Sequence, residues 1–320
     1  ENLAASIEQR ANDALFTSGS VRAQGNCLLF VYKAAAEIGE LGDNTAAMRS
    51  AVVADDLLRS VLALTGVRVT VLGHTRWASV GIISEPNAHP VTSEELDRAA
   101  DNVSVAVLNG DVDNHADLKV RHSLKFAEPI TTDAKVIPAL VNRFCAAGET
   151  TTDAFRHAVA SFEGSVAIGL CTADNPGNLL FALHGSGQGL CIGLAEDRFI
   201  VASEPYGLVE ETLSYIRMDG EALAHSDQPS SRGQIMVLDA NSAGTVAGAC
   251  MIAYDGTELP ITDAVLMTAE VTTRDIDRGD APHFLLKEIM EAPQSFHKTL
   301  RGRIDEVDSL LRADLGESSF

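Results

Sequence analysis

The sequence lacks the features that would assign it to several specialised protein classes. No apolar run approaches the roughly 18 residues that a membrane-spanning helix needs, and no signal peptide opens the chain. The five cysteines, Cys27, Cys145, Cys171, Cys191 and Cys250, include no Cys-x-x-Cys pair. Their odd number, wide spacing and apolar neighbours are typical of free thiols in a reducing compartment, so we expect a cytoplasmic protein.

Basic residues are scarce as well. Lys and Arg together number 24 against 45 Asp and Glu, which gives a formal net charge of −21. A field of that sign repels phosphate backbones and anionic lipid, so neither nucleic-acid nor membrane-surface binding is expected. The histidines show no metal-ligand spacing, and the segment from Asn109 has Asn114 and Val120 where a calcium loop needs glycine and glutamate. The sequence therefore predicts no metal site.

The pattern that is present predicts a mixed fold. Apolar periodicity predicts helices over 46–63, 133–144 and 151–161, and strands over 27–32, 67–73, 103–108, 164–171, 179–184, 190–194, 198–202, 214–218 and 234–238. Short turns separate several of the later strands, which indicates antiparallel hairpins. The predicted class is α+β, with layers of sheet and helix. Beyond residue 255 a loop-like stretch leads to a helix over Phe284–Met290, a break at Pro293 and a final helix with an apolar stripe from Phe296 to Leu311.

Four short motifs follow one another along the chain. They are His74-Thr75-Arg76-Trp77-Ala78, Asn87-Ala88-His89-Pro90, Leu108-Asn109-Gly110 and Thr132-Asp133. In this order they resemble the class II glutamine amidotransferases, whose nucleophile is an N-terminal cysteine. The resemblance is closest to the glutaminase domain of the glucosamine-6-phosphate synthases (glutamine–fructose-6-phosphate aminotransferases). Matches at 162–168, 184–187, 199–204 and 283–293 extend it over residues 30–305.

The resemblance implies a fold, a domain division and a reaction. The fold is a four-layer α/β/β/α sandwich of the N-terminal-nucleophile hydrolase type with antiparallel sheets. Residues 1–255 form the amidotransferase domain, and residues 256–320 are an interdomain linker with the first helices leading to an absent sugar-isomerase domain. L-Glutamine is hydrolysed to glutamate and ammonia without a cofactor, and the ammonia converts fructose 6-phosphate to glucosamine 6-phosphate. The resemblance also implies a homodimer for the full-length protein.

Two charged residues are candidate ligands for the ends of glutamine. The planar guanidinium of Arg76 suits a bidentate contact with the α-carboxylate, although most arginines only form surface or structural ion pairs. Asp133 could pair with the α-ammonium, or it could cap the helix that begins beside it. The resemblance assigns both residues to glutamine binding.

Asn109 and Gly110 are the candidate catalytic pair. An Asn-Gly step after a strand also forms hairpin turns, so a purely structural interpretation stays open. The resemblance makes the Asn109 side-chain amide and the Gly110 backbone N–H the donors of an oxyanion hole. Losing one such donor costs about a hundred- to thousandfold in rate. Glycine suits this task because its bare backbone permits close approach.

Three further residues are assigned to glutamine binding by the resemblance alone. Trp77 would lie on the loop that closes over glutamine, although a single tryptophan is also a common core anchor. His89 would support the site rather than act in the chemistry. Ser79 keeps one hydroxyl where the family has Thr-His, since Val80 replaces the histidine. Leu108 stands where the family commonly has histidine, which marks a divergent branch.

The nucleophile of the family is not found in the expected position. The chain begins with Glu1-Asn2-Leu3, whereas these enzymes use an N-terminal cysteine whose own α-amino group is the base. Cys27 lies in an apolar strand and is interpreted as a core residue. We therefore expect that the nucleophile lies upstream and that this polypeptide alone does not turn over glutamine. Two alternatives stay open: another class II amidotransferase, such as a phosphoribosyl-pyrophosphate amidotransferase or asparagine synthetase, or a non-catalytic glutamine-sensing domain.

Overall fold

The computed structural model describes residues 3–11, 13–35, 42–75, 81–96, 102–270, 278–300, 304–307 and 310–313. These belong to two compact units, Glu1–Ala269 and Glu270–Phe320. The first unit contains all of the sheets and helices that surround the predicted site. The described residues of the second unit form one helix and one hairpin.

A seven-stranded antiparallel sheet forms the centre of the first unit, with strand order β12-β11-β10-β6-β5-β4-β3. Its strands are β3 (Val91–Thr92), β4 (Ser104–Gly110), β5 (Val166–Thr172), β6 (Asn178–His184), β10 (Gln234–Asp239), β11 (Ala249–Ala253) and β12 (Glu258–Leu259). β4 pairs with β5 along its whole length, from Ser104 opposite Thr172 to Gly110 opposite Val166. β3 pairs only with the first half of β4, where Val91 lies opposite Ala106. One edge of the second half of β4 is therefore left without a neighbouring strand in the described chain.

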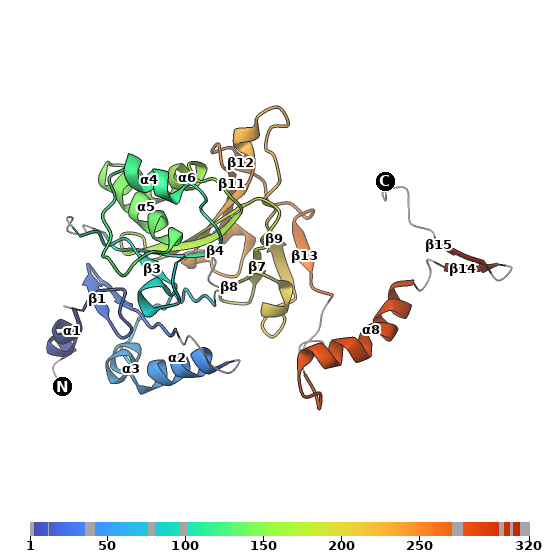
Figure 1. Ribbon diagram of the computed structural model, residues 1–320, viewed down its shortest axis with the longest axis horizontal. Coiled ribbons are helices and arrows are strands. Elements are labelled where there is room, and N and C mark those ends of the chain that lie inside the picture. Colours follow the sequence, from blue (N-terminus) through green and yellow to red (C-terminus); the bar gives the residue numbers. More distant parts are fainter. Residues whose placement is uncertain are drawn as a thin grey trace. The chain divides into compact units, whose positions relative to one another are not determined.

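Three helices cover one face of this sheet (Figure 1): α4 (His115–Arg121), α5 (Val136–Ala146) and α6 (Thr151–Ala160). Ile137 and Leu140 of α5 and Phe155 of α6 are completely buried in one core with Leu108 and Ile168 of the sheet. This core follows from the apolar stripe of each helix and from Ala106 and Leu108 of β4, which alternate along the strand and face the helices. This core places the end of β4 against the start of α5.

A four-stranded sheet packs against the opposite face of the large sheet. Its order is β13-β9-β7-β8, with β7 (Cys191–Leu194), β8 (Phe199–Ala202), β9 (Ser214–Arg217) and β13 (Leu266–Thr268). Phe181 and Met236 of the large sheet share a core with Ile192 and Ile216 of the smaller one. The fold is therefore α+β with antiparallel sheets, as the sequence predicts.

An N-terminal hairpin adds to this second face. It consists of β1 (Val21–Gln24) and β2 (Cys27–Phe30), and it is accompanied by α1 (Leu3–Ala11), α2 (Asp43–Ala54) and α3 (Asp56–Leu62). Leu29 packs toward Val105 of β4, while Phe30 packs toward Leu57 and Val61 of α3. Because side chains alternate along a strand, the hairpin lies between β4 and the helices. The structure thus has four successive layers, as expected. The first is formed by helices α4–α6, the second by the large sheet, the third by the hairpin, and the fourth by helices α1 and α3.

The described residues of the first unit also form short 3₁₀ turns: η1 (Glu85–Asn87), η2 (Asp133–Lys135), η3 (Pro205–Gly207), η4 (Pro229–Ser231), η5 (Ala240–Ser242) and η6 (Val246–Gly248). Two of them position the site. η1 lies in the loop before β3, and η2 directly precedes α5.

Two predicted elements of the first unit differ from the structure. The single helix predicted over 46–63 is two helices, because the Asp55 side chain accepts the Leu58 N–H and caps α3. The strand predicted over 67–73 is not formed. Val69 and Val71 are 61% and 80% exposed, so the alternating valines meet no apolar surface and the segment has no strand partner among the described residues.

The second unit also differs from the prediction. Helix α8 (Phe284–Leu300) continues through Pro293 instead of breaking there. The final helix predicted to Leu311 is wrong, because β14 (Ile304–Val307) and β15 (Leu310–Ala313) form an antiparallel hairpin. β12 and β13 lie after residue 255 and pair within the sheets of the first unit. The functional division into 1–255 and 256–320 stays a prediction.

Candidate active site at the end of strand β4

The backbone amides of β4 alternate between two sides of the strand. Toward β5, the Asp111 N–H donates to the Ser165 carbonyl at 3.2 Å. On the other side, the Leu108 N–H donates to Nδ1 of His89 at 3.3 Å, and the Val112 N–H donates to Oδ2 of Asp133 at 2.8 Å. Two side chains thus occupy the edge that β3 leaves open.

The amide of Gly110 lies between these two contacts. Amides of an extended chain alternate in direction, so the Gly110 N–H points to the same side as those of Leu108 and Val112. Asp111, which bonds to β5, confirms this alternation. The Gly110 N–H is therefore directed away from β5, between His89 and Asp133. The amide of this half-buried glycine can donate to a ligand oxygen placed on that side of the strand.

Gly110 can be only glycine at this position. Its φ is +105°, a conformation that L side chains rarely adopt. A Cβ atom added there would lie 2.0 Å from the carbonyl oxygen of Ser165. The close approach of β5 therefore fixes both the residue type and the direction of its N–H.

The Asn109 side chain lies on the other face of the sheet from Leu108. Asn109 pairs with Ala167, whose side chain belongs to the core between the two sheets. Cross-strand partners point to the same face, so Asn109 points to that side at the end of the strand, where it is exposed. The hairpin-turn interpretation of Asn109 and Gly110 is wrong, because both are paired strand residues and the chain continues into α4.

Asp133 is a buried carboxylate at the first position of η2, 3% exposed. Its Oδ2 accepts the Val112 N–H, and Thr132 Oγ1 lies 3.4 Å from its Oδ1. It makes no side-chain capping bond, since Thr132 occupies the cap position. No cation pairs with Asp133 among the described residues. A buried carboxylate with only neutral partners can accept a positively charged ligand group.

His89 and His74 form a pair beside this edge. Their Nδ1 atoms are 3.2 Å apart, and their ring centroids are 5.0 Å apart. Because His89 Nδ1 accepts the Leu108 N–H, we assign the His89 proton to Nε2 and the donor role between the rings to His74. His89 is 6% exposed and supports the strand that carries Asn109. This geometry agrees with the supporting role expected for it, which stays a prediction.

The remaining predicted glutamine ligands, Arg76, Trp77 and Ser79, lie outside the described residues. The chain on either side of them borders a cavity of about 360 Å³. His74, Asn87 and His89 line one side of this cavity, and residues 44–48 at the start of α2 line the other. Asn109 and Asp133 do not line it. The described residues thus bring Asn109, Gly110, His89 and Asp133 together, and they leave the arginine untested.

No described cysteine is suited to attack a carbonyl carbon beside Gly110. Burial raises the pKa of the Cys171 thiol to about 11, and it raises the pKa of Cys145, Cys191 and Cys250 as well. Cys27 contacts the carbonyl oxygen of Ala173, which pairs with Val103 at the opposite end of β4. The six residues from there to Asn109 span about 20 Å of strand.

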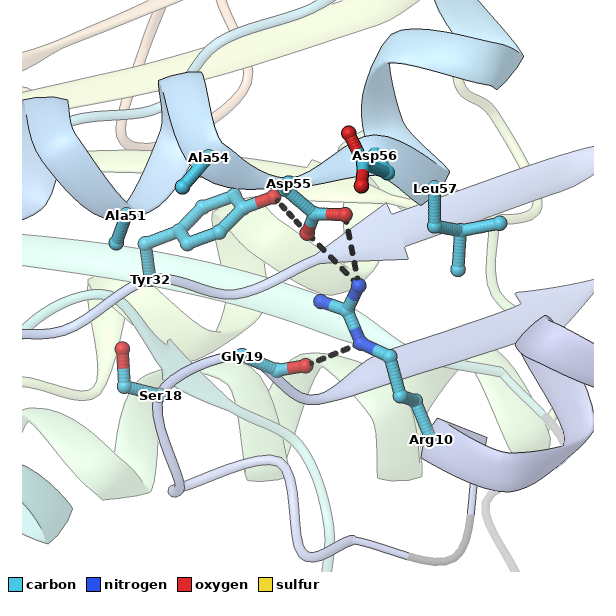
Figure 2. A pocket seen from close by; sticks show the side chains of 9 residues that line it. All are labelled: Arg10, Ser18, Gly19, Tyr32, Ala51, Ala54, Asp55, Asp56 and Leu57. Atoms are coloured by element: carbon cyan, nitrogen blue, oxygen red, sulfur yellow. Dashed lines mark hydrogen bonds and ion pairs between the residues drawn. The ribbon is translucent and has the colours of Figure 1, made fainter.

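A second hollow, of about 490 Å³, is lined by the end of α1, by residues on either side of the hairpin, by the end of α2 and by the start of α3. Figure 2 shows Arg10 and Tyr32 bonded to Asp55, and Arg10 bonded to the Gly19 carbonyl. Arg10 Nη1 lies 2.9 and 2.8 Å from the two carboxylate oxygens of Asp55, and the Tyr32 hydroxyl donates to Asp55 Oδ2 at 2.6 Å. This network connects α1 to α3. Because its three side chains already bond to one another, we interpret it as structural.

Two absences apply to the described part of the chain. It contains no group of three or more histidine, cysteine, aspartate or glutamate side chains that could hold a metal ion. None of its helices combines the length and the apolar character needed to cross a membrane.

Comparison with known proteins identifies relatives by sequence. No protein-family model matches the chain. Glutamine–fructose-6-phosphate aminotransferase (isomerizing) of Streptococcus pyogenes is 29% identical over 250 residues, which is 78% of this chain and 37% of that protein. The enzymes of the same name from Geobacillus kaustophilus and Halalkalibacterium halodurans are each 31% identical, over 75% and 71% of this chain. The chain spans about a third of the length of these relatives, 37%, 35% and 33% respectively.

Among solved structures, a glutamine phosphoribosylpyrophosphate amidotransferase from B. subtilis is similar with a TM-score of 0.42 and 18% sequence identity. The similarity covers 57% of this chain and 34% of that one. A second structure, an allosteric regulatory enzyme of purine biosynthesis, has a TM-score of 0.39 and covers 52% of this chain.

Proposed function

We propose a function from the premise that the chain belongs to the glutamine–fructose-6-phosphate aminotransferase family over 75% of its length. The chain is the part of such an enzyme that binds L-glutamine and releases ammonia from it. One observation carries the proposal. The Gly110 N–H lies between amides whose acceptors are His89 and Asp133, so a glutamine anchored at Asp133 can direct its side-chain carbonyl to Gly110.

Each part of glutamine has a proposed partner. The α-ammonium pairs with the carboxylate of Asp133, which lacks a cationic partner in the described chain. The α-carboxylate pairs with Arg76, with Trp77 and Ser79 completing the enclosure, as the family resemblance implies. The amide carbonyl oxygen accepts hydrogen bonds from the Gly110 N–H and the Asn109 side chain. His89 holds the strand that carries both donors.

The proposed chemistry is acyl transfer through a thioester. A cysteine thiol attacks the side-chain amide carbon, a C–S bond forms, and the carbonyl π electrons move onto oxygen. Asn109 and Gly110 stabilise that oxyanion more strongly than the neutral carbonyl, which lowers the barrier. The thiol proton passes to the departing nitrogen, the oxyanion re-forms the carbonyl as the C–N bond breaks, and ammonia leaves. Water then attacks the thioester carbon and the C–S bond breaks, which gives glutamate and the free thiol. The thiol comes from an N-terminal cysteine in the family.

The rest of the assigned role depends on the full-length relatives. By their names they act on glutamine and fructose 6-phosphate. We propose that the ammonia released here converts fructose 6-phosphate to glucosamine 6-phosphate in a further domain, within a cytoplasmic homodimer. In that arrangement residues 256–320 lead from the amidotransferase domain to the sugar-binding part.

Glutamine binding to the 320-residue chain tests the proposal. Calorimetry should detect L-glutamine binding, and Asp133→Asn should weaken it by at least about tenfold, because a charge-assisted hydrogen bond is lost. Asp117→Asn, at an exposed position on α4, is the matched control and should bind like the wild type. An undetectable interaction, or equal affinity in Asp133→Asn, would contradict the proposal.

A second candidate is a glutamine-sensing domain that binds without hydrolysis. The raised pKa values of the Cys145, Cys171, Cys191 and Cys250 thiols, and the remote position of Cys27, favour it over catalysis by a cysteine within these residues. The gene sequence upstream of Glu1 separates the two candidates. A Met-Cys-Gly start indicates the enzyme, and its absence indicates the sensor.

A further inference from the structure

Asn87 links two segments of the site that are far apart in sequence. It is 2% exposed, and its Oδ1 accepts the backbone N–H groups of Thr131 at 2.7 Å and Thr132 at 2.9 Å. Its Nδ2 donates to Ser84 Oγ at 2.9 Å and to the Pro129 carbonyl at 3.1 Å. One buried side chain thus uses both ends of its amide to hold residues 129–132 against the loop that precedes β3.

The segment that Asn87 holds ends directly at Asp133. Two consecutive amides that share one acceptor fix the local backbone, because neither residue can rotate without losing a buried hydrogen bond. Gly81 adds a steric limit, since a Cβ on it would lie 3.1 Å from Thr131 Oγ1 and 3.2 Å from Thr132 N. The position of the Asp133 carboxylate is therefore set from the loop on one side and by Val112 on the other.

The same loop also sets the oxyanion pair. His89, two residues after Asn87, accepts the Leu108 N–H directly before Asn109. The segment 87–89 thereby contacts the Asp133 turn through Asn87 and the end of β4 through His89. The bond between Val112 and Asp133 closes a ring of three segments, 87–89, 108–112 and 131–133.

We propose that Asn87 is a positioning residue that holds Asp133 where it can pair with the α-ammonium of glutamine. The inference rests on the proposed function, since it assigns Asp133 to that ammonium. Both ends of the Asn87 amide bond to protein groups, so it acts through Asp133. Its Oδ1 sets the turn at 131–132, and the turn sets the carboxylate.

The test compares L-glutamine with glutaramate, which is glutamine without the α-ammonium group. The readout is the ratio of the two dissociation constants for each variant of the full chain. The wild type should prefer L-glutamine by about tenfold to a hundredfold, because one charge-assisted contact distinguishes the ligands. Asn87→Ala should reduce this preference to within about threefold while leaving the affinity for glutaramate nearly unchanged. A general loss of folding would weaken both ligands alike.

Ser84→Ala is the matched control. It removes a hydrogen-bond partner of Nδ2 and leaves both contacts of Oδ1 in place, so the preference for L-glutamine should persist. If Asn87→Ala keeps the full preference, the positioning role is overturned and the proposed function stands. If the wild type has no preference or does not bind, the proposed function and the inference fall together.

Hydrogen exchange in the wild type tests the same idea without a variant that could misfold. L-Glutamine should slow exchange of the Thr131, Thr132 and Val112 amides more than saturating glutaramate does, because only L-glutamine engages Asp133. Equal protection by the two ligands would overturn the inference.

Discussion

The Val112 amide and the Asp133 carboxylate are joined by a hydrogen bond of 2.8 Å between N and Oδ2. Val112 lies two residues beyond Gly110, which is at most about 7 Å of extended chain. The bond therefore places the Asp133 carboxylate close to the Gly110 N–H, the proposed oxyanion donor. Asp133 is the only charged group among the described residues of the candidate site. It also connects the start of α5 to the end of β4, so the helix layer and the sheet position the two groups together.

Gly110→Ala should destabilise the protein strongly. The new Cβ would lie 2.0 Å from the Ser165 carbonyl oxygen, and the residue would have to keep a φ of +105°. We expect the free energy of unfolding to fall by at least about 2 kcal/mol. Denaturant unfolding measures this loss.

Gly177→Ala is the control for that substitution. A Cβ at Gly177 meets no atom within 4 Å, and its φ is not positive. The unfolding free energy should change by less than about 1 kcal/mol. Similar losses for the two variants would show that Gly110 is not constrained by β5.

Asp55 should make the protein sensitive to acid. Burial acts to raise the pKa of its carboxyl, but hydrogen bonds from Tyr32, the Leu58 amide and Arg10 outweigh burial and lower the pKa. When folding lowers the pKa of a carboxyl, the carboxylate stabilises the folded protein at every pH above the pKa of the unfolded chain, which is near 4. This stabilisation is lost as the pH falls through the lower pKa of the folded state.

Asp55→Asn should therefore lower the unfolding free energy at pH 7 by about 1–3 kcal/mol. The difference from the wild type should shrink as the pH falls below about 4. Denaturation at pH 7 and pH 3 measures both values. A difference that is the same at both pH values would show that the charge of Asp55 is not involved.

Lys135 should destabilise the folded state near neutral pH. It is 1% exposed, its Nζ donates to the Thr92 carbonyl, and burial lowers the pKa of its ammonium to about 7. Between pH 7 and pH 10, Lys135 holds its proton in the unfolded chain but loses it in the folded protein. The contribution of Lys135 to the free energy of unfolding therefore rises with pH over that range.

Lys135→Met keeps the length of the side chain and removes the buried charge. The nearby carboxylates keep their partners, since Glu94 pairs with Arg22 and Glu95 with Arg143. We expect the variant to be more stable by about 1–3 kcal/mol at pH 6, with the gain shrinking toward pH 10. A gain that grows with pH would contradict the account.

The sequence predicts those elements whose signal is local. Strands β4 to β10 and the helices that begin near Asp133 and Thr151 follow from apolar periodicity, and each was found. The short strands β3, β11, β12 and β13 were not predicted. The break at Asp55 has a local signal too, because aspartate is a preferred helix cap, but a continuous apolar stripe concealed it.

Other features depend on partners that are distant in sequence. The alternating valines of 67–71 have the pattern of a strand, yet pairing requires a neighbour that periodicity cannot supply. The role of Asn109 was ambiguous because only its pairing with Ala167 excludes a hairpin turn. Asn87 was not predicted as a site residue, because the partners that connect it to Asp133 lie more than 40 residues away, on the 129–132 segment. Its place in the Asn-Ala-His-Pro motif was the one available signal.

A crystal structure of the chain with bound L-glutamine tests the central claim most directly. We predict that the α-amino nitrogen lies within hydrogen-bond distance of Asp133 and that the side-chain carbonyl oxygen lies about 3 Å from the Gly110 nitrogen, with the Asn109 amide as second donor. Glutamine bound elsewhere, or bound with its carbonyl oxygen directed away from Gly110, would contradict the assignment.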